Sequence, residues 1–127
     1  MQLSQELPDY TYALRSADGR HARVNTQTLT ASFILAPDTL VESWPVTTVA
    51  ALDVAALEPA FALNPAVILL GTGQRQVFPP AAVMAACLGR GIGLEVMSND
   101  SAARTFNVLA AEARRVVAAF IIEPSAG

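Results

Sequence analysis

The sequence predicts an α/β fold with an added antiparallel β layer, and two features of the chain support that prediction. Residues 10–46 contain short apolar segments separated by turn residues such as Asp18-Gly19, which is typical of antiparallel strands. Residues 49–122 alternate between helical and strand-like apolar segments. Because strand–helix alternation requires crossover connections, we expect the sheet to be at least partly parallel in this second region.

The first region is predicted to be antiparallel β structure. A first strand is expected over Tyr10–Arg15, and an Asp-Gly turn within Ser16–Arg20 predicts that the next segment pairs back as a hairpin. A further strand is predicted over Leu29–Ala36, where a Pro-Asp pair ends it. The segment Val41–Val46 is predicted as a short edge strand, because Pro45 has no N–H for a central ladder.

The second region is predicted to alternate helices and strands. Thr47 or Thr48 is placed to cap a first helix, which Asn64-Pro65 closes. The segment Ala66–Gly71 is apolar throughout, as expected of a strand covered on both faces. The other elements are helices over Val49–Phe61, from Pro79-Pro80 to Gly89–Gly91 and over Ser101–Arg114, and strands over Gly93–Met97 and Val116–Ile122.

Length and composition indicate a globular chain. Its 127 residues suit one domain, 1–127, with a loose arm at 1–9 and a loose tail at 123–127. Hydrophobic residues make up 53% and charged residues 15%, which excludes the disordered class. The net charge of −3 argues against nucleic acid or an anionic membrane as the main partner. The chain is not expected to be embedded in a membrane, since no apolar run approaches the roughly 20 residues required.

The residue types present exclude several chemistries and predict a cytoplasmic location. Cys87 is the only cysteine, which fits a reducing compartment, and the N-terminal segment lacks the basic and apolar parts of a secretory signal. There is no lysine, so Schiff-base chemistry and the lysine of a phosphate-binding P-loop are excluded. His21 is the only histidine, and Cys87 lies among alanines, where a cysteine is usually a packed hydrophobe. We therefore expect no catalytic residues, no metal and no cofactor.

Two polar loops follow strands that are predicted to end at the same edge of the sheet. GTGQRQ contains Gly71, Thr72, Gly73 and Arg75, and MSNDSA contains Ser98 and Asn99. Ligands of open α/β sheets collect at such strand ends, so these side chains and the N–H groups of the last helix are candidates for binding an anion. The alternative is that the glycines only permit a tight turn with positive φ, since the segment does not complete a G-x-G-x-x-G motif.

Several polar side chains near the last predicted helix require partners. Arg104 lies in its first turn, where a cation opposes the helix dipole, so a compensating anion, carboxylate or carbonyl is expected nearby. Glu95 is a charge in an apolar strand, and Arg104 or Arg75 is expected to pair with it. Asn107 borders the apolar face and is expected to bond a strand end or a loop backbone. A structural and a binding role remain open for Arg104 and Asn107.

The remaining charges of this helix have a simple interpretation. Arg114 and Arg115 are predicted to close its last turn, where cations complement the dipole. Glu112 is spaced three residues from Arg115 and is expected to pair with it. The apolar face is rich in alanine, so the helix is expected to lie close against a sheet; it consists of Ala102, Ala103, Phe106, Leu109, Ala110 and Ala113.

The segments LLGTGQRQVFPP and GIGLEVMSNDSAARTFNVLAAEARRVVAAFI together resemble a family of small domains. The family includes a mitochondrial assembly factor of complex I (NADH:ubiquinone oxidoreductase) and the adipogenesis-associated domain-containing protein. Its pattern is GTG after a strand, then GI-x-VE-x-M, then A-C-R-T-Y-N-x-L-x-x-E-x-R-x-V-x-A. The matching positions are Gly71–Gly73, Gly91-Ile92, Glu95, Met97, Ala102, Arg104, Thr105, Asn107, Leu109, Glu112, Arg115, Val117 and Ala119.

The chain departs from this pattern at two positions. Ala103 stands where many members have Cys, and Phe106 stands in place of Tyr. The resemblance implies a three-layer α/β fold with a central mixed sheet and an extra β layer, and it implies no catalytic residues. Because the mitochondrial member binds other proteins, the resemblance also implies a non-enzymatic interaction or assembly module with protein partners.

Two other functions remain open from the sequence. One is a protein that binds a small anion, or an enzyme without a recognised motif, using the loops Gly71–Arg75 and Ser98–Arg104. The other is self-association through an exposed β edge or an apolar patch, with the oligomeric state undetermined.

Overall fold

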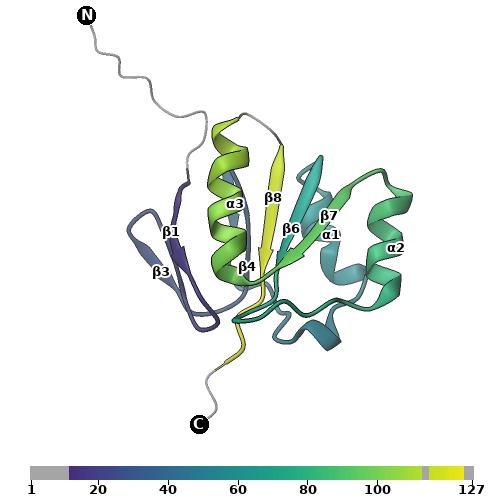
Figure 1. The fold of residues 1–127 in the computed structure, drawn as a ribbon, viewed down its shortest axis with the longest axis horizontal. Helices are drawn as coiled ribbons and strands as arrows, with labels where there is room; N and C mark the ends of the chain where they lie inside the picture. The colour runs from purple at the N-terminus through teal and green to yellow at the C-terminus, as the bar shows by residue number, and fades with distance from the viewer. Residues whose placement is uncertain (1–11, 113–114, 125–127) are drawn as a thin grey trace, which may run out of the picture.

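A mixed five-stranded sheet forms the centre of the fold (Figure 1). The computed structural model describes residues 12–112 and 115–124. The sheet has the strand order β5-β4-β8-β6-β7, with β6 parallel to both β7 and β8 and with β4 antiparallel to β8 and β5. Its strands are β4 (Phe33–Ala36), β5 (Thr39–Val41), β6 (Val67–Gly71), β7 (Gly93–Met97) and β8 (Val116–Phe120). The prediction of a partly parallel sheet is confirmed.

The central strands are buried on both faces, which explains their uninterrupted apolar sequences. Every residue of β4, β6 and β8 is buried. Because side chains alternate along a strand, Val67 and Leu69 of β6 enter one hydrophobic cluster while Ile68 and Leu70 enter the other.

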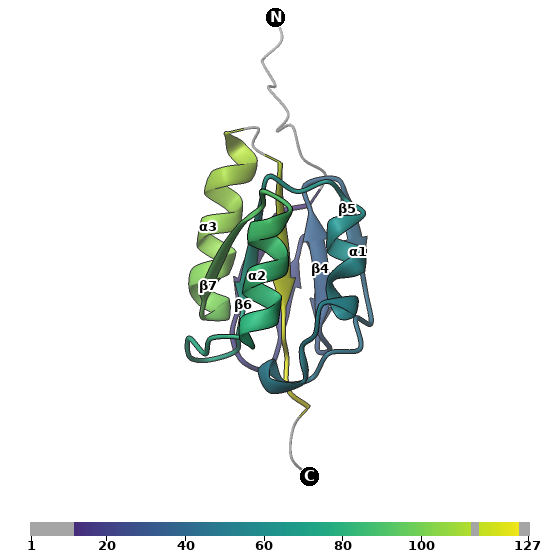
Figure 2. The same cartoon turned by 90° about the vertical axis from the view of Figure 1, so that its right-hand side faces the viewer.

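Three layers are formed by the elements on either side of this sheet, as predicted. One face is covered by α3 (Asn99–Ala111) together with an antiparallel sheet of β1 (Leu14–Ala17), β2 (Ala22–Val24) and β3 (Gln27–Leu29) (Figure 1). The opposite face is covered by two 3-10 turns, η1 (Val49–Ala51) and η2 (Ala55–Leu57), and by the helices α1 (Glu58–Phe61) and α2 (Ala81–Gly89) (Figure 2).

Helix α3 packs closely on the sheet through small side chains, as its sequence predicts. Ala102, Ala103, Phe106 and Ala110 are all buried in the cluster that β6 and β8 also enter. Ser98 caps the helix by accepting a hydrogen bond from the N–H of Ser101. The helix begins two residues earlier and ends earlier than predicted, and the predicted face residue Ala113 lies outside the described residues.

The single helix predicted over Val49–Phe61 is wrong, because the chain forms η1, η2 and the one-turn α1 there. Thr48 caps only η1, and the backbone is extended at Leu52. Asp53 then starts a new turn by accepting the N–H of Ala56 at 2.8 Å. Pro59 has no N–H for a continuous helix and lies instead at the start of α1. Side-chain capping and proline therefore override the helical pattern.

Strand boundaries in the first region also differ from the prediction. The strand predicted over Leu29–Ala36 is two strands, β3 and β4, because the chain passes from one sheet to the other near Ser32. The Ser32 hydroxyl accepts the N–H of Ile122 at 2.8 Å where the chain makes this passage. The edge strand predicted over Val41–Val46 is wrong, because the edge strand β5 covers Thr39–Val41 and residues 42–46 form no strand. Strand β1 begins at Leu14. Tyr10, where β1 was expected to begin, lies outside the described residues.

Candidate functional site

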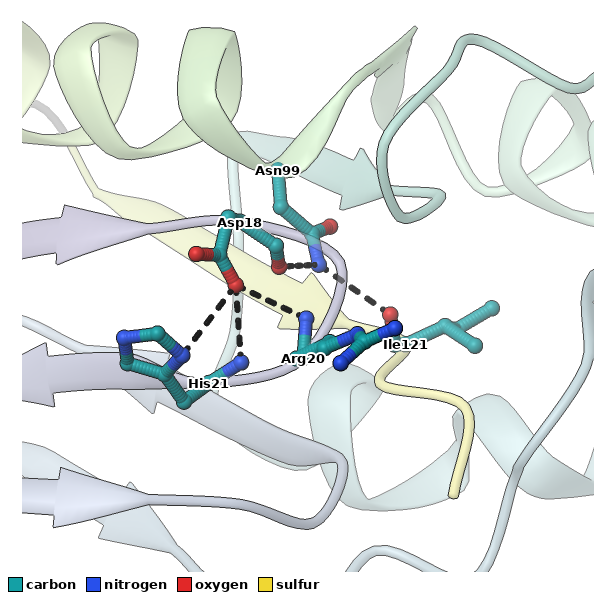
Figure 3. Close-up of polar contacts among 5 residues, drawn as sticks. All are labelled: Asp18, Arg20, His21, Asn99 and Ile121. Atoms are coloured by element: carbon teal, nitrogen blue, oxygen red, sulfur yellow. Dashed lines mark hydrogen bonds and ion pairs between the residues drawn. The ribbon is translucent and has the colours of Figure 1, made fainter. Parts of the chain in front are cut away.

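The candidate site lies where the parallel strands β6, β7 and β8 end at one edge of the sheet (Figure 1). The loop after β6, the start of α3 and the segment after β8 all leave from this edge. The tip of the β1–β2 hairpin reaches the same place, and Figure 3 shows Asn99 of α3 between that tip and Ile121. Four segments that are distant in sequence therefore meet here.

Asn99 holds these segments together. Its side chain is fully buried, and its Oδ1 accepts the N–H of Gly73 at 3.0 Å. Its Nδ2 donates to the carbonyls of Asp18 and Ile121, at 2.8 and 3.1 Å. Its backbone N–H donates to the Gly73 carbonyl at 2.8 Å. Because both amide hydrogens and the oxygen are bonded to backbone groups, Asn99 acts as an internal link between loops.

Gly71 and Thr72 are fitted to the same link. A Cβ on Gly71 would collide with Asn99 Oδ1 and lie 2.9 Å from Cδ1 of Phe120, so only glycine fits. The buried Thr72 hydroxyl lies 2.5 Å from the Arg75 carbonyl and accepts the N–H of Val77 at 3.0 Å. These contacts fold the loop after β6 back on itself.

The groups expected to bind an anion at the start of α3 are therefore bonded within the protein. Gly73, with φ of +101°, has its N–H taken by Asn99, and Thr72 has its N–H taken by the Met97 carbonyl. Ser98 receives the N–H of Ser101. Gly73 thus has the positive φ that the glycine-turn alternative predicts.

Arg104 and Glu95 are not brought together. Arg104 forms an ion pair with Asp100 one turn earlier, and both side chains are 67% exposed. Asp100 is the compensating carboxylate that the position of Arg104 in the first turn required. Glu95 is exposed on the edge strand β7, and within the described residues it pairs with neither Arg104 nor Arg75. The predicted Glu95 pair is wrong, because an edge position leaves its carboxylate in water.

Asn107 and Arg115 both bond backbone groups. Asn107 accepts the N–H of Leu14 at 3.2 Å and donates to the Leu14 carbonyl at 2.7 Å, so the predicted bond to a strand backbone is confirmed. Arg115 lies beyond the end of α3, where its Nε donates to the Leu63 carbonyl at 2.8 Å and its guanidinium pairs with Asp38 at 3.2 Å. The predicted pairing with Glu112 and the predicted place in the last helical turn are wrong. Arg114, predicted beside it, lies outside the described residues.

The hairpin tip is organised by Asp18. Its carboxylate accepts the N–H groups of Arg20 and His21 at 2.8 and 2.9 Å and lies 3.4 Å from Nδ1 of His21 (Figure 3). Those two hydrogen bonds hold the pKa of the Asp18 carboxyl below its ordinary value, and the bond from the N–H of Arg20 has the larger effect. The turn that presents Arg20 is therefore fixed at neutral pH.

A surface pocket of about 370 Å³ lies between this hairpin tip, the loop after β6 and the segment after β8. Of the predicted site residues, Thr72, Gly73 and Arg75 line it, whereas Ser98, Asn99 and Arg104 do not. Sequence reasoning missed Arg20, and its only signal is a place beside the Asp-Gly turn. The lining residues are Gly19, Arg20, Thr72, Gly73, Gln74, Arg75, Val77, Glu123 and Pro124.

An apolar surface lies on and before α2, and the sequence analysis did not single it out. Val77 and Phe78 are 44% and 63% exposed, and Met84 and Leu88 are 40% and 80% exposed. We call these four residues the α2 surface. The signal was present in PPAAVMAACLG, which has apolar residues all round the helix and is too short to be a membrane span. Burial of Cys87 on the inner side raises the pKa of its thiol and confirms that it is a packed hydrophobe.

Two further observations limit the chemistry of the described residues. Across 12–112 and 115–124, no three side chains among His, Cys, Asp and Glu are grouped closely enough to hold a metal ion. In the same ranges, no helix has the length and apolar character needed to cross a bilayer.

The observations above define a small three-layer α/β protein. The polar groups at the carboxyl ends of its parallel strands mainly form hydrogen bonds with one another and with the neighbouring backbone. Residues 14–121 match the family described as protein of unknown function (DUF498/DUF598), and the chain belongs to that family. The family resemblance drawn from the GTG and helix motifs is thereby confirmed.

Two curated proteins are similar in sequence. NADH dehydrogenase (ubiquinone) 1 alpha subcomplex assembly factor 3 of Danio rerio is 32% identical over 120 residues, which cover 93% of this chain and 65% of the relative. The 13 kDa major membrane protein of Francisella tularensis subsp. holarctica (strain LVS) is 37% identical over 60 residues, covering 47% of this chain and 49% of the relative. The matched region thus spans about half to two-thirds of these relatives.

Solved structures share the fold. An NMR structure of a Xanthomonas campestris protein is 65% identical, with a TM-score of 0.82 and coverage of 96% of this chain and 92% of that one. A solution structure from Bordetella pertussis, described as an Mth938-like domain, is 28% identical with a TM-score of 0.79, covering 99% and 95%. The three-layer α/β fold is therefore shared with proteins of several bacteria.

Proposed function

We propose that this protein is a non-enzymatic interaction module that assists the assembly of a protein complex, and that it binds its partner through the α2 surface. The observation that supports this most directly is the exposure of four large apolar side chains on one short segment, with Leu88 at 80%. Exposed apolar surface of this kind marks protein interaction sites. The similarity to an assembly factor supports the same function.

The position of α2 favours a protein partner. Helix α2 packs against the edge strand β7, where it contributes Val83 and Cys87 to the core and leaves Met84 and Leu88 outside. Arg90 at its end is engaged with Glu58 and lies 4.1 Å from the centre of the Phe61 ring. The remaining surface is uncharged, so its partner is expected to present an apolar helix face or loop.

The proposed module acts in the cytoplasm. Cys87 is buried and free, which is the state that a reducing compartment maintains. The absence of lysine and the net charge of −3 make the surface unsuited to nucleic acid or anionic lipid.

The test compares two glutamate substitutions at exposed apolar positions on different helices. Leu88→Glu alters the α2 surface, and Val108→Glu is the matched control, because Val108 is 56% exposed on α3. A photo-crosslinker beside Met84 identifies the partner, and titration of the purified pair then measures affinity. We expect Leu88→Glu to weaken binding at least tenfold, as for the loss of a buried apolar anchor, and Val108→Glu to leave it unchanged.

Two results would contradict the proposal. Equal binding by both variants would show that the α2 surface is not the contact. Sedimentation of the purified protein as a dimer that only Leu88→Glu dissociates would show that a second copy, rather than another protein, covers this surface.

A further inference from the structure

The pocket at the carboxyl ends of β6 and β8 is lined by two arginines that form no ion pair within the described residues. Arg20 and Arg75 both line it, and neither has a carboxylate partner within the described residues. Arg90, Arg104 and Arg115 each pair with a carboxylate, whereas Arg15 and Arg23 form no ion pair within the described residues and do not line this pocket. Figure 3 shows the Arg20 side chain extending from the hairpin tip toward the segment after β8. The pocket therefore offers positive charge from two separate loops, and the charge of Arg20 also acts on the nearby Asp18 carboxylate.

Both loops are held in place by contacts within the protein. The Asp18 carboxylate and the Asn99 amide fix the hairpin tip, and a Cβ on Gly19 would lie 2.7 Å from Cγ of Gln74, so the two loops touch there. The Thr72 hydroxyl fixes the second loop through the Arg75 carbonyl and the Val77 N–H. Two loops fixed in this way present their arginines at low entropic cost to a ligand.

Two backbone N–H groups belong to residues that line the same pocket. Within the described residues, the N–H groups of Gln74 and Arg75 have no hydrogen-bond acceptor. Their glycine-containing turn follows a strand at the sheet edge where ligands of open α/β folds bind. Guanidinium and backbone N–H groups are the donors that carboxylate and phosphate oxygens accept from.

Size and charge limit what the pocket would hold. Its volume of about 370 Å³ is at the small end of ligand pockets. Glu123 also lines it, which reduces the lining charge of the two arginines and Glu123 to a net +1. These features favour one small anionic group over a polyphosphate. We propose that this pocket binds a small oxyanion, as a free ion or as the carboxylate or phosphate group of a small metabolite, between Arg20 and Arg75.

Titration of the full chain with inorganic phosphate and, separately, with succinate tests the proposal by NMR of the backbone amides at constant ionic strength. We expect saturable shifts at Gln74, Arg75 and Arg20 with at least one of the two probes. Arg20→Gln and Arg75→Gln should each weaken that binding about tenfold, the size of one lost charge-assisted hydrogen bond. Glu123→Gln should strengthen it, because it removes a repelling carboxylate.

Arg23→Gln is the matched control, since Arg23 is exposed on β2 and does not line the pocket. Shifts that do not saturate with either probe, or equal losses in Arg23→Gln and Arg75→Gln, would overturn the oxyanion site. Saturation by phosphate alone or by succinate alone identifies which oxyanion the pocket accepts. The α2 surface is unchanged in these variants. A negative result for the oxyanion site would therefore not bear on the proposal that the α2 surface binds a protein partner.

Discussion

Asn107 and Leu14, 93 residues apart in the chain, pair through both backbone groups of Leu14 and both ends of one side-chain amide. The distances are 3.2 Å for the N–H of Leu14 and 2.7 Å for its carbonyl. Leu14 lies on β1, which is an outer strand of the three-stranded sheet. The amide of Asn107 thus completes an edge that would otherwise have unpaired backbone groups and fastens that sheet to α3.

Removal of this amide should loosen β1 selectively. We expect Asn107→Ala to destabilise the protein by about 1–3 kcal/mol, because two partly buried backbone groups lose their partners. Amide hydrogen exchange should become faster at Leu14 than at Ile68 of the central sheet. Val108→Ala, at an exposed neighbouring position, should change stability by less than about 0.5 kcal/mol. Uniform acceleration across both sheets would contradict a local role.

Substitution of Asn99 tests the link between the loops. Asn99→Ala should cost about 2–4 kcal/mol, because the N–H of Gly73 and the carbonyls of Asp18 and Ile121 lose a buried partner. Chemical denaturation followed by fluorescence of Trp44, the only tryptophan and 3% exposed, measures the loss.

The Asn99→Asp substitution keeps the shape of the side chain and should make the stability of the protein depend on pH. Burial and two facing carbonyls should raise the folded-state pKa of the introduced carboxyl above its unfolded value of about 3.9. A raised folded pKa means that the variant is most stable at low pH and loses stability as pH rises through that pKa. A pH-independent difference from the unsubstituted protein would contradict the buried geometry.

Two glycine-to-alanine substitutions should have opposite effects. Gly71→Ala should destabilise by about 1–3 kcal/mol, because the added methyl collides with Asn99 and Phe120. Gly89→Ala should stabilise by up to about 1 kcal/mol, because Gly89 ends α2 with open space around its Cα. Thermal unfolding of the two variants, compared with the unsubstituted protein, distinguishes these signs. Equal changes in stability for the two variants would show that the contacts of position 71 with Asn99 and Phe120 do not exclude an alanine side chain.

The pKa of Asp38 reports the position of Arg115. The guanidinium of Arg115, and then the hydroxyl of Thr39, hold the pKa of the Asp38 carboxyl below its ordinary value of 3.8. A lowered folded pKa contributes stability that is present above pH 3.8 and is lost as pH falls through the folded pKa. In Arg115→Met, carboxyl NMR should show the Asp38 pKa returning toward its ordinary value. Arg104→Met is the control and should leave it unchanged, since Arg104 pairs with Asp100.

The sequence predicted the elements whose residues are determined by local pattern. The buried strand β6, the alanine face of α3 and the Asp-Gly hairpin were all placed correctly, because burial periodicity and turn residues act over a few positions. The same local pattern failed at Val49–Phe61, where the Asp53 side chain and Pro59 interrupt a helix that hydrophobic spacing favours. Hydrophobic periodicity does not indicate where a single side-chain hydrogen bond, such as that of Asp53, interrupts a helix.

The candidate site required the tertiary structure. The sequence supplied Asn99, Thr72 and Arg75 as polar residues at strand ends, but it did not show that Asn99 bonds three other segments. Nor did it show that Arg20, more than 50 positions away from Arg75, lines the same pocket. By itself the sequence determined which residues are apolar, which turns are tight and where charges lie along each element. Only the packing of distant segments decided which polar groups bond each other and which line a common pocket, because that depends on distances that local pattern does not encode.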